Sequence, residues 1–173
     1  MRYNQGRYIL SEQSEHKYIG RNKDNIIFRS GWERAFMHYL SNAAGVIAWS
    51  SEEIIIQYKN PLKNRISRYF MDFFVRVKDK KGNIKQILVE VKPFSQTQQP
   101  RMTTSKTGKK TSKRMKSFQY AIETYTVNMA KWEATVEFCK KNELDFFLLT
   151  DDPHKQGSVK FKLWHWSELL SFV

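Results

Sequence analysis

The segment from Arg68 to Val91 constrains the fold more than any other part of the chain. Residues 68–77 are apolar on both faces of an extended strand, residues 79–83 have the composition of a turn, and residues 84–91 return as the hairpin partner. A strand that is apolar on both faces is buried on both faces, so other elements must cover its sheet on each side. The segment therefore predicts an interior β-hairpin inside a layered fold.

The segments on either side of this hairpin supply the covering layers. Ser30 and Glu33 form a capping-box pattern ahead of an apolar stripe, which predicts a helix that ends near residues 42–45. Apolar residues at helical spacing between 115 and 139 predict two helices or one broken helix.

Three further segments are strand-like, namely residues 54–58, 145–150 and 158–163, and residues 166–172 predict a short closing helix. We therefore expect the α/β class, with a mixed β-sheet flanked by helices.

The length of 173 residues favours one domain. We expect residues 1–29 to form an irregular polar arm and residues 30–173 to form the domain, with a basic mobile loop at about 95–111. A single cysteine, Cys139, excludes an internal disulfide and a multi-cysteine zinc site. The chain has no apolar run of the ~20 residues that a membrane span needs and no signal-peptide pattern at its start, so we expect neither a membrane partner nor secretion.

The charge of the chain favours an anionic partner. Lys and Arg number 30 against 17 Asp and Glu, which gives a net charge of +13, and nucleic acid is the commonest anionic partner. Between Lys92 and Ile122 the chain has no acidic residue. We predict that the cations after Lys92 contact DNA phosphates, and they are Arg101, Lys106, Lys109, Lys110, Lys113, Arg114 and Lys116. If this part is helical, its apolar stripe of Met115, Phe118 and Ile122 should pack on the sheet and leave the cations outside.

Among the charged residues of the hairpin, Asp72, Glu90 and Lys92 fall amid Phe, Val, Leu and Met. Asp72 lies on the first strand, and Glu90 and Lys92 lie on the second, on the same face because the side chains of a strand alternate. Charged groups in apolar surroundings need a partner or a metal. A divalent cation such as Mg²⁺ relieves the repulsion between two carboxylates, and Lys92 could then stabilise charge on a phosphate or orient the attacking water. Glu33 is the natural third carboxylate.

Each of these residues also has a plainer interpretation. Glu33 could serve only the capping box, Asp72 and Lys92 could form a buried ion pair without catalysis, and Glu90 could face solvent from an edge strand. The ordered set of a helical Glu, a strand Asp, a turn and a strand Glu-x-Lys is more specific than any member of it.

This ordered set resembles the PD-(D/E)xK nuclease superfamily, with Met71-Asp72 in place of Pro-Asp. The chain is also similar to the head-completion nucleases of tailed phages. The segments that carry this similarity are residues 29–33, 47–52, 68–72, 90–93, 96–100 and 125–132. The resemblance implies a restriction-endonuclease-like core in αβββαβ order and DNA cleavage with Mg²⁺ or Mn²⁺. It also implies a role in finishing packaged heads before the tails attach.

Carried over by position, the resemblance implies a catalytic set and its ligands. The catalytic residues would be Glu33, Asp72, Glu90 and Lys92, and the metal ligands Asp72, Glu90, Glu33 and the carbonyl of Val91. Glu52 would be an auxiliary residue, and Gln119 is expected to be exposed on a helix.

The leading hypothesis is therefore a metal-dependent DNA endonuclease, with exonuclease activity as a further option. The alternatives are an assembly protein that binds the head or portal with a dispensable nuclease, and a nuclease that resolves junctions or cleaves transposon ends. The expected partners are DNA and phage head, portal or neck proteins. The expected location is the host cytoplasm during assembly, with association with the virion as an option. The chain has no P-loop sequence, so we expect no nucleotide cofactor.

Overall fold

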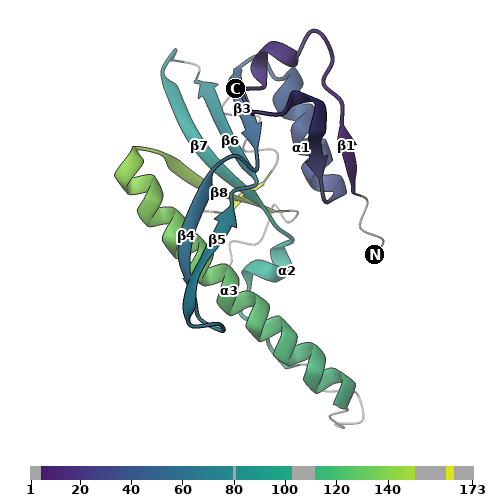
Figure 1. Ribbon diagram of the computed structural model, residues 1–173, viewed down its shortest axis with the longest axis vertical. Helices are drawn as coiled ribbons and strands as arrows, with labels where there is room; N and C mark the ends of the chain where they lie inside the picture. Colours follow the sequence, from purple (N-terminus) through teal and green to yellow (C-terminus); the bar gives the residue numbers. More distant parts are fainter. Residues whose placement is uncertain (1–4, 80, 103–111, 151–162, 166–173) are drawn as a thin grey trace.

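The computed structural model describes residues 5–79, 81–102, 112–150 and 163–165 (Figure 1). Within them, one sheet has the strand order β3-β6-β7-β8-β9, and two smaller sheets pair β1 with β2 and β4 with β5. The elements in chain order are β1 (Gly6–Tyr8), η1 (Glu15–Lys17), η2 (Lys23–Asn25), β2 (Ile26–Phe28), α1 (Gly31–Asn42), β3 (Val46–Ser51), β4 (Ile55–Asn60), β5 (Arg65–Phe70), β6 (Phe73–Lys78), β7 (Ile84–Val91), α2 (Phe94–Thr97), α3 (Ser112–Asn142), β8 (Asp145–Thr150) and β9 (Leu163–His165).

The predicted hairpin is the centre of the large sheet. Strands β6 and β7 pair antiparallel with Phe73 opposite Val89, β3 pairs antiparallel with the outer edge of β6, and β8 runs parallel to β7. The predicted α/β class and the capping box at Ser30 are confirmed, as is the strand at residues 145–150. Strand β3 was not predicted, although its first four residues are apolar.

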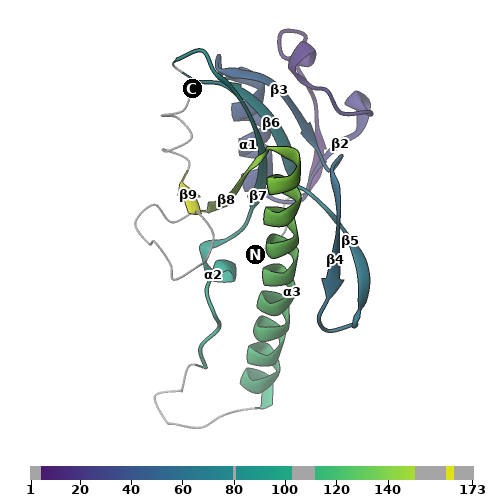
Figure 2. The ribbon, with the colours of Figure 1, turned by 90° about the vertical axis from the view of Figure 1, so that its left-hand side faces the viewer.

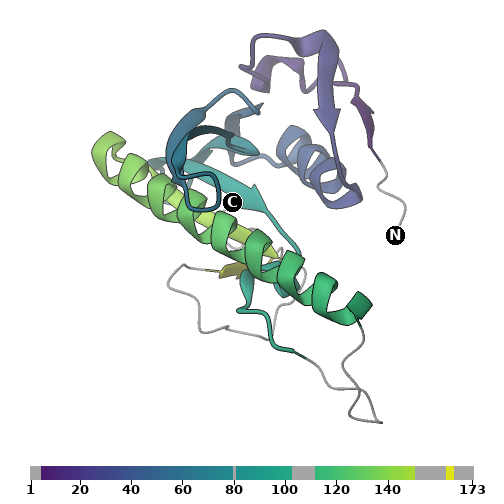
Figure 3. The same cartoon turned by 60° about the horizontal axis from the view of Figure 1, so that its bottom comes forward.

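Both faces of the sheet are covered, as the apolar hairpin requires. Figure 3 shows α1 and the N-terminal segment on one side of the sheet and α3 on the other. Phe73, Val75 and Val89 belong to the core on the α1 side, whereas Leu88 belongs to a second core that α3 closes. Cys139 on α3 is buried in this second core, and burial raises the pKa of its thiol to about 12.

The expectation that residues 1–29 form an irregular arm is wrong. The described part of this segment contains β1 and β2, and Tyr18, Ile26 and Phe28 are buried in the core on the α1 side. The ring of Tyr18 packs edge-on against Trp49, with 4.8 Å between the ring centroids. These apolar residues are too widely spaced in the sequence to give a periodic signal, so only tertiary packing reveals them.

The single strand predicted for residues 68–77 is in fact two strands. Strand β5 pairs with β4, whereas β6 pairs with β3 and β7, so the chain changes sheets at Met71 and Asp72. Glu52 lies beside this crossing, where its N–H donates to the carbonyl of Asp72, and it adopts a left-handed φ of 56°. The crossing takes Asp72 out of both strands and leaves its side chain beside the end of β7.

Helix α3 is one unbroken helix of 31 residues, so the predicted break is wrong. The segment contains no Gly or Pro that would end a helix. A helix of this length rises about 46 Å, which exceeds the length of the strands, and Figure 2 shows it extending past the sheet. Its first turns therefore do not pack on the sheet as predicted: Met115 is 53% exposed and Ile122 is 41% exposed.

Several predicted features lie wholly or partly outside the described residues. Residues 94–97 of the expected loop form α2, whereas residues 103–111 are not described. The strand predicted at 158–163 and the helix predicted at 166–172 also lie outside, except that Leu163 begins β9.

Candidate active site

Asp72 is anchored to the neighbouring strand through its side chain. The backbone N–H of Val91 donates to Asp72 Oδ2 over 2.9 Å, which connects the start of β6 to the end of β7. The side chain of Asp72 is 19% exposed. The backbone thus fixes one oxygen of this carboxylate, and the side chain remains partly exposed to solvent.

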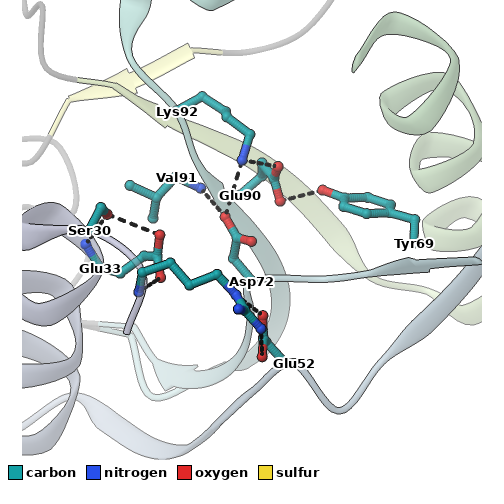
Figure 4. A network of polar contacts seen from close by, with 9 residues as sticks. Ser30, Glu33, Glu52, Tyr69, Asp72, Glu90, Val91 and Lys92 are labelled. Carbon is teal, nitrogen blue, oxygen red and sulfur yellow. Dashed lines mark hydrogen bonds and ion pairs between the residues drawn. The ribbon is translucent and has the colours of Figure 1, made fainter. Parts of the chain in front are cut away.

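Glu90 lies on the α3 side of the sheet. Because β7 alternates, Leu88 and Glu90 share one face, and the side chain of Glu90 is 1% exposed. Its Oε1 accepts a hydrogen bond from Lys92 Nζ over 2.8 Å, and its Oε2 accepts one from the hydroxyl of Tyr69 (Figure 4). The interpretation of Glu90 as a solvent-facing carboxylate on an edge strand is therefore wrong.

Lys92 connects the two carboxylates. Its Nζ lies 2.8 Å from Glu90 Oε1 and 3.9 Å from Asp72 Oδ2 (Figure 4). One ammonium group thus faces two carboxylates, and with all three groups ionised the cluster carries one surplus negative charge. A surplus of negative charge in a poorly solvated place favours the binding of a proton or a cation.

The pKa shifts agree with this charge balance. Burial, followed by repulsion from Glu90, raises the pKa of Asp72 well above its usual range, and Lys92 and the Val91 N–H only partly oppose this. Burial disfavours the charged form of Lys92, but attraction to Glu90 and Asp72 is stronger, so the pKa of Lys92 is raised. Burial and the same two carboxylates raise the pKa of Tyr69, so its hydroxyl stays protonated and donates to Glu90.

Two residues of this environment were missed by the sequence analysis. Tyr69 comes from β5, and Lys131 of α3 places its Nζ 4.9 Å from the centroid of the Tyr69 ring. Burial lowers the pKa of Lys131. Nothing in the sequence separates Tyr69 from the other apolar residues of its strand. Lys131 could have been found, because it lies one helical turn from Val127 on a partly buried face of the helix.

Glu33 is held at the start of its own helix. Its two carboxylate oxygens accept hydrogen bonds from Arg29 N over 2.7 Å and from Ser30 Oγ over 2.9 Å, and its own N–H donates to Ser30 Oγ. Arg29 also pairs with Glu52 at 2.9 Å. Glu33 is near enough to raise the pKa of Asp72, but its place as a metal ligand stays a prediction, and so does that of the Val91 carbonyl.

The cluster suits a hard divalent cation. In the part of the chain that the structure describes, no three His, Cys, Asp or Glu side chains gather closely enough to hold a metal ion. Asp72 and Glu90 are the two carboxylates that share Lys92. Mg²⁺ commonly binds through one or two carboxylates and completes its shell with water and substrate oxygens. The pair of donors and its surplus charge fit that requirement.

The predicted DNA contacts are only partly described. Arg101 and Arg114 line a groove between α2 and the first turns of α3, and Lys113 and Lys116 are exposed on the same turns. The remaining three, Lys106, Lys109 and Lys110, lie outside the described residues. Gln119 is exposed, as expected, and donates to Glu123 over 3.0 Å.

Comparison with known proteins identifies the family. A sequence model described as the N-terminal domain of TnsA-like endonucleases matches residues 44–151, which include Asp72, Glu90 and Lys92. The chain belongs to this family. It is also 35% identical over 136 residues to the head completion nuclease of Enterobacteria phage T4, across 79% of this chain and 85% of that protein.

This member of the family contains no helix, within its described residues, that is both long enough and apolar enough to span a membrane. The longest described helix, α3, carries charged residues along its whole length.

Replacing Asp72 with Asn should stabilise the metal-free protein in a pH-dependent way. The folded state raises the pKa of Asp72, so the wild type loses stability as the pH rises above the pKa of the unfolded chain. We expect Asp72→Asn to melt a few degrees above wild type at pH 8 in EDTA, since about 1 kcal/mol moves the melting temperature of such a domain by roughly 2–4 °C. The difference in melting temperature between Asp72→Asn and wild type should be smaller at pH 5.

Asp79→Asn is the matched control in circular-dichroism melting experiments. Hydrogen bonds from Asn83 lower the pKa of Asp79, so this variant should lose stability instead. An Asp72→Asn variant that melts below wild type at pH 8 would contradict the charge balance described above.

Proposed function

We propose that this chain is a DNA nuclease that hydrolyses phosphodiester bonds with Mg²⁺ or Mn²⁺ and acts in the completion of phage heads. The observation that carries the proposal is the cluster of Asp72, Glu90 and Lys92 at the meeting of β6 and β7. The similarity to the head completion nuclease of Enterobacteria phage T4 supports the biological role. By that role, the protein would act in the host cytoplasm while heads are assembled and would meet head, portal or neck proteins.

Asp72 and Glu90 would hold the cation. When bound, a divalent cation polarises a phosphoryl oxygen and lowers the pKa of a water molecule. The residues themselves supply position: the Val91 N–H fixes Asp72 Oδ2, and the Tyr69 hydroxyl fixes Glu90 Oε2.

Lys92 would stabilise the negative charge that develops on the phosphate. Attraction to Glu90 and Asp72 raises the pKa of Lys92, which favours the protonated form of its Nζ. In hydrolysis, water forms a new P–O bond, the ester P–O bond breaks and the leaving oxygen gains a proton. A fixed ammonium that donates toward the phosphate favours the more highly charged transition state.

The exposed cations after the site would bind the DNA backbone. Arg101, Lys113, Arg114 and Lys116 follow Lys92 in the chain without an intervening carboxylate. Contacts with phosphates are independent of sequence and weaken with salt, as suits an enzyme that acts on DNA without choosing a sequence.

Loss of Asp72 or Lys92 should abolish cleavage. We expect Asp72→Asn and Lys92→Met each to slow the nicking of supercoiled plasmid in 5–10 mM Mg²⁺, by at least about 100-fold. The controls are Asp79→Asn and Lys78→Met, which make the same changes at the other end of the hairpin and should cut like wild type. Full activity in either site variant would refute the assignment.

The same variants separate the alternatives. An assembly protein with a dispensable nuclease predicts that the folded Asp72→Asn protein still yields joined heads and tails in a complementation assay. A junction-resolving or transposon-end nuclease predicts faster cleavage of branched than of linear DNA.

Tyr69→Phe should weaken metal binding without unfolding the site. The change removes only the hydroxyl that orients Glu90, and the loss of such a supporting hydrogen bond typically costs about 10–100-fold in metal affinity or activity. We expect this loss in Mn²⁺ binding followed by electron paramagnetic resonance, together with partial recovery of cleavage at high Mn²⁺.

Tyr58→Phe is the control, because Tyr58 is also buried beside Lys131 but its hydroxyl accepts from Asn60. Equal Mn²⁺ affinities in the two variants would exclude a positioning role for Tyr69.

A further inference from the structure

Strands β4 and β5 form a two-stranded ribbon that stands apart from the large sheet. They pair antiparallel from Ile55 opposite Phe70 to Asn60 opposite Arg65. Figures 1 and 2 show this β4–β5 ribbon running along α3 and ending in a free loop. An isolated ribbon is marginal in water, so it needs support on one face.

Helix α3 gives that support to the inner face only. Ile56, Tyr58 and Tyr69 are buried in the core that α3 closes. The alternate residues point away from the helix, and of them Ile55 is 45%, Ile66 63% and Phe70 45% exposed. The outer face of the ribbon is therefore a formed surface that no described part of the chain covers.

The charge of the ribbon has one sign. Between Ile54 and Met71 there are four cations and no acidic residue, and all four are exposed: Lys59, Lys63, Arg65 and Arg68. None of the four forms a salt bridge within the described residues. The sequence analysis did not single out these cations, because apolar residues separate them.

The base of the ribbon is continuous with the active site. Phe70 precedes Asp72 by two residues, and Tyr69 reaches from the inner face to Glu90 (Figure 4). Six residues at about 3.3 Å each extend the ribbon roughly 20 Å from this base to its loop. The outer face thus begins, at Phe70, two residues along the chain from Asp72, whereas Tyr69 connects the inner face to Glu90.

We propose that the β4–β5 ribbon binds duplex DNA and seats the substrate over Asp72. This inference rests on the proposed nuclease function and adds that the substrate is double-stranded where it meets the ribbon. The major groove of B-DNA admits a two-stranded β-ribbon, and its flanking phosphates would be met by Lys59 and Arg68 on the outer face and by Lys63 and Arg65 at the loop end. Since a base pair rises about 3.4 Å, the ribbon reaches about six base pairs from the scissile bond.

Charge complementarity selects DNA over a protein partner. The centre of a protein interface is depleted in charged residues. On the outer face, Arg68 lies opposite Gln57 and Lys59 lies opposite Ile66, so cations alternate with the apolar side chains along the ribbon. A polyanion satisfies this pattern throughout, whereas an apolar protein surface would leave the cations without partners.

Neutralising the ribbon should weaken duplex binding specifically. The test variant is Lys59→Gln/Lys63→Gln/Arg65→Gln/Arg68→Gln, measured by fluorescence anisotropy on a 30-base-pair duplex in EDTA, so that nothing is cleaved. We expect Kd to rise at least about 10-fold at 150 mM salt, and the slope of log K against log salt to fall by up to about 3.6, since each phosphate contact contributes about 0.9.

A matched variant removes the same charge elsewhere. Lys78→Gln/Lys81→Gln/Lys140→Gln/Lys141→Gln changes four exposed cations at the β6–β7 turn and the end of α3, and it should alter Kd less than about 3-fold. Equal losses of DNA affinity in the two variants would overturn the proposal. Unchanged binding in the ribbon variant would also overturn it, and would favour a protein as the partner of the outer face. If binding depends on the ribbon but wild type cleaves no DNA, the nuclease assignment fails and the ribbon proposal stands.

A second measurement does not depend on neutralised variants. A photo-crosslinker on Leu62→Cys, in the loop of the ribbon, should join the duplex, whereas the same group on Ile84→Cys, at the far end of the hairpin, should not. Both positions are exposed and the native Cys139 is buried. Crosslinks of equal yield from the two positions would contradict a specific contact of the ribbon.

Discussion

The ammonium group of Lys92 between two carboxylates is the interaction on which the site depends. Without it, Asp72 and Glu90 would repel each other in a poorly solvated layer, and one of them would have to take up a proton or leave. With it, the pair stays together but keeps a surplus negative charge. The folded protein therefore keeps two carboxylates and one ammonium group in a poorly solvated place, at some cost to its own stability.

The fold delivers these three groups through a few local features. Antiparallel pairing of β6 with β7 brings Asp72 beside Val91, and strand alternation puts Glu90 on the α3 side. The crossing of the chain from the β4–β5 ribbon into the large sheet frees Asp72 from strand pairing. The same crossing places Tyr69 against Glu90, so the ribbon that we propose as a DNA contact also holds in place the carboxylate that we propose as a metal ligand.

Much of this site could be predicted from the sequence because charges inside an apolar hairpin have few explanations. Asp72, Glu90 and Lys92 stood out for that reason, and the turn at 79–83 set their register. Tyr69 did not stand out, since a buried tyrosine in an apolar strand has no pattern of its own. The change of sheet at Met71 was equally hidden, because a local sequence does not reveal which strand will be its partner.

The same limit explains the errors further from the site. Tyr18 and Phe28 join the core through contacts with distant residues, and no periodicity announces such contacts. Met115 and Ile122 have a helical period, but a period does not show where the sheet ends beneath a long helix. Local pattern thus predicted the type of most elements, and tertiary context decided their pairing and coverage.

The central claim is that Asp72 and Glu90 form a site for one class of ligand, a hard divalent cation. The most direct test is a crystal of the protein grown with Mn²⁺ and measured for anomalous scattering at the manganese edge. We expect an anomalous peak between the two carboxylates, within about 2–2.5 Å of an oxygen of each. A manganese-saturated crystal with no peak there, and with Lys92 still between Asp72 and Glu90, would contradict it.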